Sequence, residues 1–150
     1  MKDLKYVAYI GESPEKVWQC LISEEGTRAS FVNCVLRTTL EIGAPYAYVG
    51  PGNDGEETVH VYGHVLTCVP NHELSLTEHA GPSYRDNHAE LETRITYRLE
   101  AVGECTKLTI INDQWPDHHP SYAQSQESWP MILSSIKTFA ETGRTLDYGW

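Results

Sequence analysis

Several features that mark other protein classes are missing from this sequence. No stretch approaches the ~18 consecutive apolar residues that a membrane-spanning helix needs, and no internal repeat or low-complexity segment divides the chain. Residues 1–5 lack the long apolar segment of a signal peptide. We therefore expect a cytoplasmic protein with a single domain over residues 1–150, a length that suits one hydrophobic core.

Basic residues are scarce. The chain has 11 Lys and Arg against 21 Asp and Glu, which gives a formal net charge of −10. Nucleic acids and anionic membrane surfaces attract proteins through clustered Lys and Arg, and the sequence contains no such cluster. We therefore expect neither nucleic acid nor a membrane among the partners.

Closely spaced cysteines are also absent. Cys20, Cys34, Cys68 and Cys105 are widely separated and form no Cys-x-x-Cys pair. Structural zinc sites usually contain such pairs, and isolated cysteines in a reducing compartment are buried apolar residues or free thiols. The spacing therefore predicts neither disulfides nor a zinc site.

The seven histidines do not form a recognisable metal site either. His118 and His119 are adjacent, and neighbouring side chains in a loop do not converge easily on one ion. His60 and His64 share one face of a predicted strand, but the rise per residue separates them by ~13 Å. We predict no bound metal and no cofactor.

Motifs for catalysis and nucleotide binding are missing as well. There is no Gly-x-Ser-x-Gly, no recognisable Cys–His context and no Gly-x-Gly-x-x-Gly or phosphate-binding loop. Glu78, His79, Asp113 and Trp115 lie near predicted strand ends, where acid–base chemistry in a cavity is possible. Because no motif specifies a reaction, we expect a binding protein rather than an enzyme.

The sequence does contain an ordered series of strand and helix patterns. Residues 4–10 alternate as a strand does. Ser13-Pro14-Glu15 supplies a hydroxyl N-cap, a first-turn proline and an acid near the positive end of a helix dipole. We expect Gly26 to end this helix and residues 27–31 to add a second short helix.

The middle of the chain consists of predicted strands separated by turns. The strands are expected at Thr58–Leu66, Glu73–Glu78, His88–Glu100 and Thr106–Asn112. His88–Glu100 has the clearest pattern, because its apolar residues alternate with charged residues. One buried face and one solvated face are typical of an antiparallel sheet.

A final amphipathic helix is predicted after these strands. Ser128 can serve as its N-cap and Gly143 as the residue that ends it. A start near Ser121 is an alternative, and Pro130 would then lie within the helix and kink it. Strands bracketed by helices favour an α+β protein over an α/β protein.

Six segments, in order over residues 5–143, together resemble one known family. They are Tyr6–Ile10 with Ser13–Trp18, Thr27-Arg28 with Phe31, Ile42–Tyr46, Gly63–Leu66 with Pro70 and Leu74, Thr106–Thr109, and Trp129–Lys137 with Glu141–Gly143. The family is the activator-of-Hsp90-ATPase-like (AHSA1-like) branch of the START/Bet v 1 (SRPBCC) superfamily. The resemblance implies a helix-grip fold, in which a curved antiparallel sheet wraps around a long C-terminal helix and two short helices follow the first strand.

The resemblance also implies a cavity between the last helix and the sheet that binds a small apolar or aromatic molecule. Tyr and Trp suit such a wall, because each combines an apolar ring with a polar group. Members of the family often carry an aromatic residue near the positions of Thr77, Glu78 and His79, so this departure alters the expected lining. The candidate ligand-binding residues are Trp18, Phe31, Tyr48, Trp115, Trp129, Leu133 and Ile136.

Two other functions stay open at this point. A cyclase- or hydrolase-like enzyme would use the same cavity, and a buried carboxylate with a raised pKa beside a His would favour it. A protein-partner module, such as a co-chaperone or a homodimer, would expose a large apolar patch. The separate N-terminal domain of the Hsp90 co-chaperone has no counterpart here, so we do not expect an Hsp90-type chaperone as partner.

Overall fold

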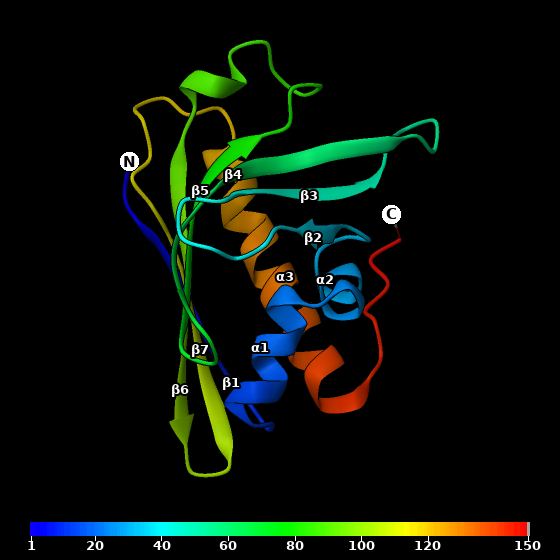
Figure 1. The fold of residues 1–150 in the computed structure, drawn as a ribbon, viewed down its shortest axis with the longest axis vertical. Coiled ribbons are helices and arrows are strands. Elements are labelled where there is room, and N and C mark those ends of the chain that lie inside the picture. Colours follow the sequence, from blue (N-terminus) through cyan, green and yellow to red (C-terminus); the bar gives the residue numbers. More distant parts are fainter. Residues whose placement is uncertain (150) are drawn as a thin grey trace.

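The computed structural model describes residues 1–149, which form one antiparallel sheet with helices against it (Figure 1). The order of strands across the sheet is β1-β7-β6-β5-β4-β3-β2. The strands are β1 Leu4–Ile10, β2 Val35–Arg37, β3 Pro45–Pro51, β4 Glu57–Val69, β5 Glu73–Ala80, β6 Thr93–Val102 and β7 Cys105–Asp113. The helices are α1 Pro14–Ile22, α2 Glu24–Ser30 and α3 Tyr122–Thr142, with a 3-10 turn at His88–Glu90.

The sheet is strongly curved around α3. Its pairing register shifts between Tyr48 and Val49, where β3 meets β4, and between Val65 and Thr67, where β4 meets β5. Such irregularities bend strands and increase their twist. In Figure 1, β3 and β4 run across the direction of β6 and β7, and α3 lies along the sheet. The α+β helix-grip fold expected from the sequence is therefore confirmed.

The two short helices meet at Ser23. Ser13 caps α1 by accepting a hydrogen bond from the Lys16 amide at 3.3 Å, as the sequence predicts. Ser23 ends α1 and caps α2 by accepting from the Gly26 amide at 2.9 Å. The prediction that Gly26 ends the first helix is wrong, because Gly26 lies inside α2. A Cβ at Gly26 would lie 2.5 Å from the Cys20 Cα, so glycine permits the close packing of α1 against α2.

Helix α3 begins at Tyr122, so the alternative start near Ser121 is correct and the predicted cap at Ser128 is wrong. Pro130 lies inside the helix and has no N–H to donate to the Gln126 carbonyl. The Tyr6 hydroxyl of β1 donates to that carbonyl instead, at 3.3 Å. Gly143 ends the helix in the left-handed conformation, with φ of 74°, as predicted.

Strand β6 begins at Thr93, and the predicted start at His88 is wrong. Pairing between β5 and β6 ends at Glu78 with Thr93, and pairing between β6 and β7 ends at Asp113 with Arg94. Residues 88–92 therefore have no neighbouring strand, and they form a 3-10 turn and a short connection. From Thr93 onward the predicted alternation is confirmed, since Ile95, Tyr97 and Leu99 are buried.

Aliphatic residues fill the core where α1 and the C-terminal half of α3 meet β1, β6 and β7. Ile10, Val17, Leu21, Leu108 and Ile136 are each 0% exposed there. None of the helices in residues 1–149 combines the length and the apolar character that a bilayer crossing requires.

All four cysteines are free thiols, and Cys20 and Cys34 are buried. Burial raises the pKa of each of these two thiols to about 11, which leaves little reactive thiolate at neutral pH.

Candidate functional site

A cavity of about 940 Å³ lies between the N-terminal half of α3 and strands β3 to β6. Its volume is within the ~300–1,000 Å³ that is usual for small-molecule sites. Helix α3 contributes side chains from Gln124 to Ile132, and β5 contributes Leu76, Glu78 and Ala80 from alternate positions. The cavity therefore occupies the region where the sheet bends away from the helix.

Five aromatic rings form the wall of this cavity. They are Phe31, Tyr46, Tyr48, Tyr97 and Trp129, and all are buried. The centroids of Phe31 and Tyr48 are 5.1 Å apart, and Tyr46 packs edge-on against Tyr48 at 5.8 Å. Tyr97 packs edge-on against Trp129 at 6.2 Å. These separations are typical of stable aromatic pairs, so the wall is a packed cluster rather than a set of isolated rings.

Trp129 is held in place by a buried asparagine. Its indole Nε1 donates to the Asn112 Oδ1 at 3.0 Å, and Asn112 is 0% exposed. The Asn112 amide nitrogen donates to the Arg94 carbonyl at 3.0 Å and to the Thr93 hydroxyl at 3.3 Å. Asn112 thus links α3 to β6 and β7 and fixes the position of the Trp129 ring at the cavity wall.

Glu78 is the carboxylic acid in the interior of the cavity. It follows Leu74 and Leu76 on the inward face of β5, and the Thr93 hydroxyl donates to its Oε1 at 3.4 Å. Burial raises the pKa of Glu78 to about 7, although the hydrogen bond from Thr93 and the nearby His79 oppose this shift. The side chain retains partial exposure, which is consistent with a group that faces the cavity. At neutral pH the group is therefore divided between its acid and carboxylate forms.

The hydroxyl groups of Tyr46 and Tyr48 differ in their hydrogen bonding. The Tyr46 hydroxyl donates to the Thr77 carbonyl at 2.5 Å. The Tyr48 hydroxyl is buried and makes no hydrogen bond of good geometry, although a side-chain interaction with the Tyr97 hydroxyl acts to lower its pKa. Burial, and then the charge of Glu78, raise the pKa of Tyr48, so the phenol stays protonated. A buried hydroxyl without a partner is uncommon and costs free energy.

The rim of the cavity carries polar side chains from β4, from the loop between β5 and β6, and from the loop between β7 and α3. His60 contacts the Tyr84 hydroxyl through Nδ1 and the Pro51 carbonyl through Nε2, the latter at 3.1 Å. Arg85 donates to the Ser121 hydroxyl at 3.5 Å. Burial, and then the charge of Arg85, lower the pKa of His119, which favours its neutral form. The rim is thus more polar than the aromatic interior.

Residues 12–141 match the family model described as Activator of Hsp90 ATPase homolog 1-like protein. The chain belongs to this AHSA1-like family. None of the curated proteins matches the sequence.

Solved structures share the fold of this AHSA1-like chain at low sequence identity. The Aha1 dimer from Colwellia psychrerythraea is 21% identical, with a TM-score of 0.72 over 96% of this chain and 99% of that one. Protein MLL2253 from Mesorhizobium loti is 18% identical, with a TM-score of 0.71 over 91% and 95% of the two chains. DynU16, from the dynemicin biosynthetic locus, is 18% identical with a TM-score of 0.75, and the match covers 100% of this chain but 51% of DynU16.

The structure brings three of the seven predicted site residues to the cavity of this AHSA1-like chain. Phe31, Tyr48 and Trp129 line it. The other four are buried but are not among the residues that line this cavity: Trp18, Trp115, Leu133 and Ile136. Trp115 packs edge-on against His119 and Tyr122, and its Nε1 donates to the Asn112 carbonyl at 2.9 Å.

The four residues suggested for acid–base chemistry are also divided. Glu78 lines the cavity, whereas His79, Asp113 and Trp115 do not. The His79 ring stacks on Tyr62, with centroids 4.9 Å apart, and its Nε2 lies 2.9 Å from Glu92. Asp113 accepts two hydrogen bonds from Arg94, at 2.6 and 2.9 Å. Of the four residues suggested for acid–base chemistry, Glu78 is therefore the one that lines the cavity.

Sequence reasoning did not assign Tyr46, Glu78 and Tyr97 to the ligand site. A signal for two of them was present, because alternation places Glu78 on the same face as Leu76 and places Tyr97 between the inward residues Ile95 and Leu99. The sequence signal for Tyr46 was weaker. The face of β3 that Tyr46 occupies follows only from its pairing with Gly63 of β4, which is known from the structure.

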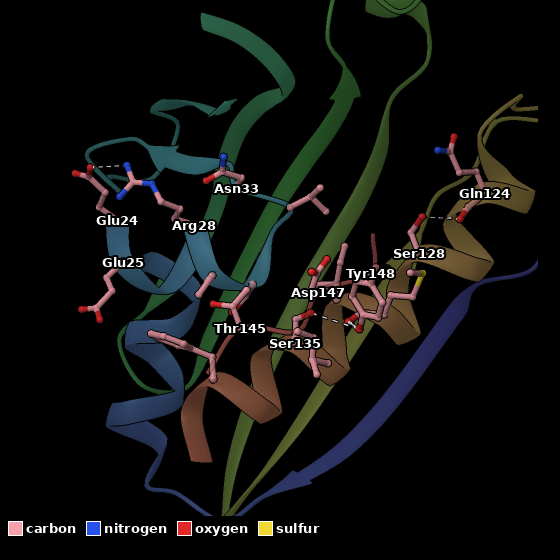
Figure 2. Close-up of a pocket in the computed structure, with 17 residues that line it drawn as sticks. Glu24, Glu25, Arg28, Asn33, Gln124, Ser128, Ser135, Thr145, Asp147 and Tyr148 are labelled. Carbon is pink, nitrogen blue, oxygen red and sulfur yellow. Dashed lines mark hydrogen bonds and ion pairs between the residues drawn. The ribbon is translucent and has the colours of Figure 1, made fainter. Parts of the chain in front are cut away.

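A second pocket of about 1040 Å³ lies between α2, α3 and the C-terminal segment (Figure 2). Exposed charged side chains of α2 surround part of it, and Arg28 pairs with Glu24 at 2.9 Å. The Tyr148 hydroxyl donates to the Met131 carbonyl of α3 at 2.8 Å, which ties the C-terminal segment to the helix. This pocket has no buried acid or base, so the aromatic cavity is the better candidate for chemistry.

Within residues 1–149, no three or more His, Cys, Asp or Glu side chains are grouped so that they could hold a metal ion. The aromatic cavity offers the carboxyl groups of Glu56 and Glu78, four tyrosine hydroxyls and a ring-lined wall to a bound molecule.

Proposed function

We propose that this AHSA1-like protein binds a small, largely apolar or aromatic molecule in the aromatic cavity. The observation that carries this proposal is a cavity of about 940 Å³ with five buried aromatic rings in its wall and the partly exposed carboxyl group of Glu78 in its interior. A cavity with apolar walls and a few polar groups is the usual form of a small-molecule site. The neighbour from the dynemicin biosynthetic locus also favours a small organic molecule as ligand.

Three of the predicted ligand-binding residues belong to this proposal as wall residues. Phe31, Tyr48 and Trp129 would contact the ligand through their rings, and the Tyr48 hydroxyl would gain a well-formed hydrogen bond. The other four predicted residues would contribute indirectly, because they would hold α3 and the sheet in position around the cavity. These residues are Trp18, Trp115, Leu133 and Ile136. We place the protein and its ligand in the cytoplasm.

The test is a screen of flavonoid-, steroid- and polyketide-like compounds, read by thermal melting and by tryptophan fluorescence. A ligand at ~100 times its dissociation constant should stabilise the fold by about 2.7 kcal/mol. The fluorescence change should come from Trp129, so the variant Trp129→Phe should lose it while Trp115→Phe should keep it. If no compound raises the melting temperature, the binding function is rejected.

Acid–base catalysis in the same cavity is a second candidate function, and Glu78 is the specific observation in its favour. A carboxyl group with a pKa of about 7 can both donate and accept a proton near neutral pH. Tyrosine hydroxyls beside it could orient a carbonyl or a hydroxyl of a substrate. Incubation of each compound that binds, followed by mass spectrometry, should then reveal a product that Glu78→Gln fails to form.

Homodimerisation is a further proposal, supported by the Aha1 dimer from Colwellia psychrerythraea. Exposed apolar residues are scattered over separate elements, among them Tyr9 on β1, Ile42 before β3 and Val102 on β6. A protein-partner module stays open as the third function, and a large exposed apolar patch is the feature that would favour it. Sedimentation velocity across a concentration series would measure the subunit count directly.

A further inference from the structure

We propose that the cavity selects an aromatic or apolar molecule that carries a basic amine, and that the ammonium group of this ligand pairs with Glu78. This inference rests on the proposed binding function and specifies the chemistry of the ligand. It depends on the charge balance of the cavity, the aromatic wall around Glu78 and the lack of a well-formed hydrogen bond at the buried Tyr48 hydroxyl.

The charges that line the cavity favour a cation. Glu56 and Glu78 are its acids, and Arg85 is the one Lys or Arg among the described lining residues. Hydrogen bonds, chiefly from its own backbone amide, lower the pKa of Glu56, so the rim carries a negative charge. Arg85 is already engaged with Ser121. The whole chain adds a formal net charge of −10, which raises the local concentration of cations.

Glu78 has no cationic partner within the described part of the cavity. The charge of His79 favours its ionised form, but the His79 ring lies 2.9 Å from Glu92 and does not line the cavity. Its side-chain hydrogen bond to Thr93 is long, at 3.4 Å, and the described lining includes no Lys or Arg beside it. An ionised carboxylate in an apolar site is costly unless it is paired. An ammonium group would supply both the opposite charge and up to three hydrogen-bond donors.

The aromatic wall suits the same ligand. Tyr46, Tyr48 and Tyr97 are close enough to Glu78 for its charge to raise the pKa of each hydroxyl. Ring faces attract cations through the ring quadrupole, and the same rings bury the apolar part of a ligand. The buried Tyr48 hydroxyl makes no well-formed hydrogen bond, with Tyr97 as its neighbour, and can accept a hydrogen bond from an N–H group.

A matched series of three probes tests this inference. The probes are 1-naphthylmethylamine, 1-naphthalenemethanol and 1-naphthoate, which share one ring system and differ in charge. Isothermal titration at pH 7.5 should show that the amine binds at least tenfold more tightly than the alcohol, and that the naphthoate binds most weakly. Because the amine needs the ionised form of Glu78, its affinity should rise about tenfold from pH 6 to pH 8.

Two variants identify the carboxyl group responsible. Glu78→Gln keeps the shape of the side chain and removes its charge, so the amine should bind no better than the alcohol and the pH dependence should vanish. Glu73→Gln is the matched control on the same strand, because Glu73 pairs with Arg98 and does not line the cavity. This control should leave all three affinities within twofold of the wild-type values.

The outcomes separate this inference from the proposed function. If the alcohol binds and the amine binds no more tightly, the amine specificity is overturned while the binding function stands. The same holds if the amine preference survives Glu78→Gln. If none of the probes binds and the compound screen is also negative, the proposed function itself fails.

Discussion

The two ends of this molecule are built from different side chains although α3 runs through both. At the packed end, aliphatic residues of α1, α3 and the sheet leave no exposed surface, as at Val17, Leu108 and Ile136. At the cavity end, rings from β3, β6 and α3 surround a cavity of about 940 Å³ that contains Glu78. The packed end is therefore a closed hydrophobic core, and the cavity end is the candidate binding site.

The difference shows how one fold supplies both stability and a binding site. Aliphatic side chains interdigitate and fill the space between α1 and the sheet. Aromatic rings contact one another at the cavity end but are too rigid to fill the space where β3 and β4 bend away from α3. Four predictions follow from this difference, in order of the expected effect.

Trp129 joins the two ends, and its loss should have the largest effect. Trp129→Ala removes a ring that is 5% exposed and leaves the Asn112 Oδ1 without its donor. We expect a loss of roughly 3–5 kcal/mol in the free energy of unfolding, measured by urea denaturation. Trp129→Phe should recover most of this loss because it keeps a ring. A loss under about 1 kcal/mol for Trp129→Ala would show that the ring does not support the core.

Glu78 should make the cavity end sensitive to pH. Its pKa is raised from 4.5 to about 7, so the folded protein holds this proton more tightly than the unfolded chain does. The stabilisation is complete below pH 4.5 and is lost as the pH rises to about 7, by about 3 kcal/mol from this group. Urea denaturation from pH 4 to 8 should therefore show a smaller decrease for Glu78→Gln than for the wild type. Glu73→Gln should follow the wild type, and parallel curves for Glu78→Gln and the wild type would contradict the assignment.

Alanine substitution of one leucine at each end would compare how tightly the two ends are packed. Leu108 is 0% exposed at the packed end, and Leu76 is 1% exposed in the cavity wall. Leucine to alanine changes in cores cost about 2–5 kcal/mol, and more where a closed void remains. We expect Leu108→Ala to cost about 1–2 kcal/mol more than Leu76→Ala, because the space left at Leu76 joins an existing cavity. Equal losses would show that the two ends are packed alike.

Phenylalanine substitution at two tyrosines of β3 should have the smallest effects on the free energy of unfolding, and these effects should differ in sign. Tyr48→Phe removes a buried hydroxyl that makes no well-formed hydrogen bond, so stability should be unchanged or rise by up to about 1 kcal/mol. Tyr46→Phe removes the hydrogen bond to the Thr77 carbonyl and should cost about 1 kcal/mol. Thermal and urea unfolding of the two variants would measure this contrast. A clear loss for Tyr48→Phe would reveal a hydrogen bond at that hydroxyl.

Local patterns in the sequence predicted most of the elements. Ser13 and Pro14 fixed the start of α1, and Gly143 fixed the end of α3, because caps depend on neighbours within a few residues. The predicted starts of β6 and α3 and the role of Gly26 were wrong. Each of these features depends on more than the neighbouring residues. The start of β6 depends on the lack of a paired strand beside residues 88–92, and the start of α3 depends on the helix continuing through Pro130. The role of Gly26 depends on the packing of α1 against α2.

The sequence by itself determined the order of strands and helices, the acidic charge and the supply of tyrosine and tryptophan. The tertiary structure decided which of these rings meet in one cavity. Phe31, Tyr48 and Trp129 come from separate segments and share a wall only because the sheet bends over α3. It also decided that Glu78, one of 21 acidic residues, lies in the cavity near those rings. The physical reason is that alternation determines which face of a strand a side chain occupies. The residues that surround this face come from segments far away in the chain.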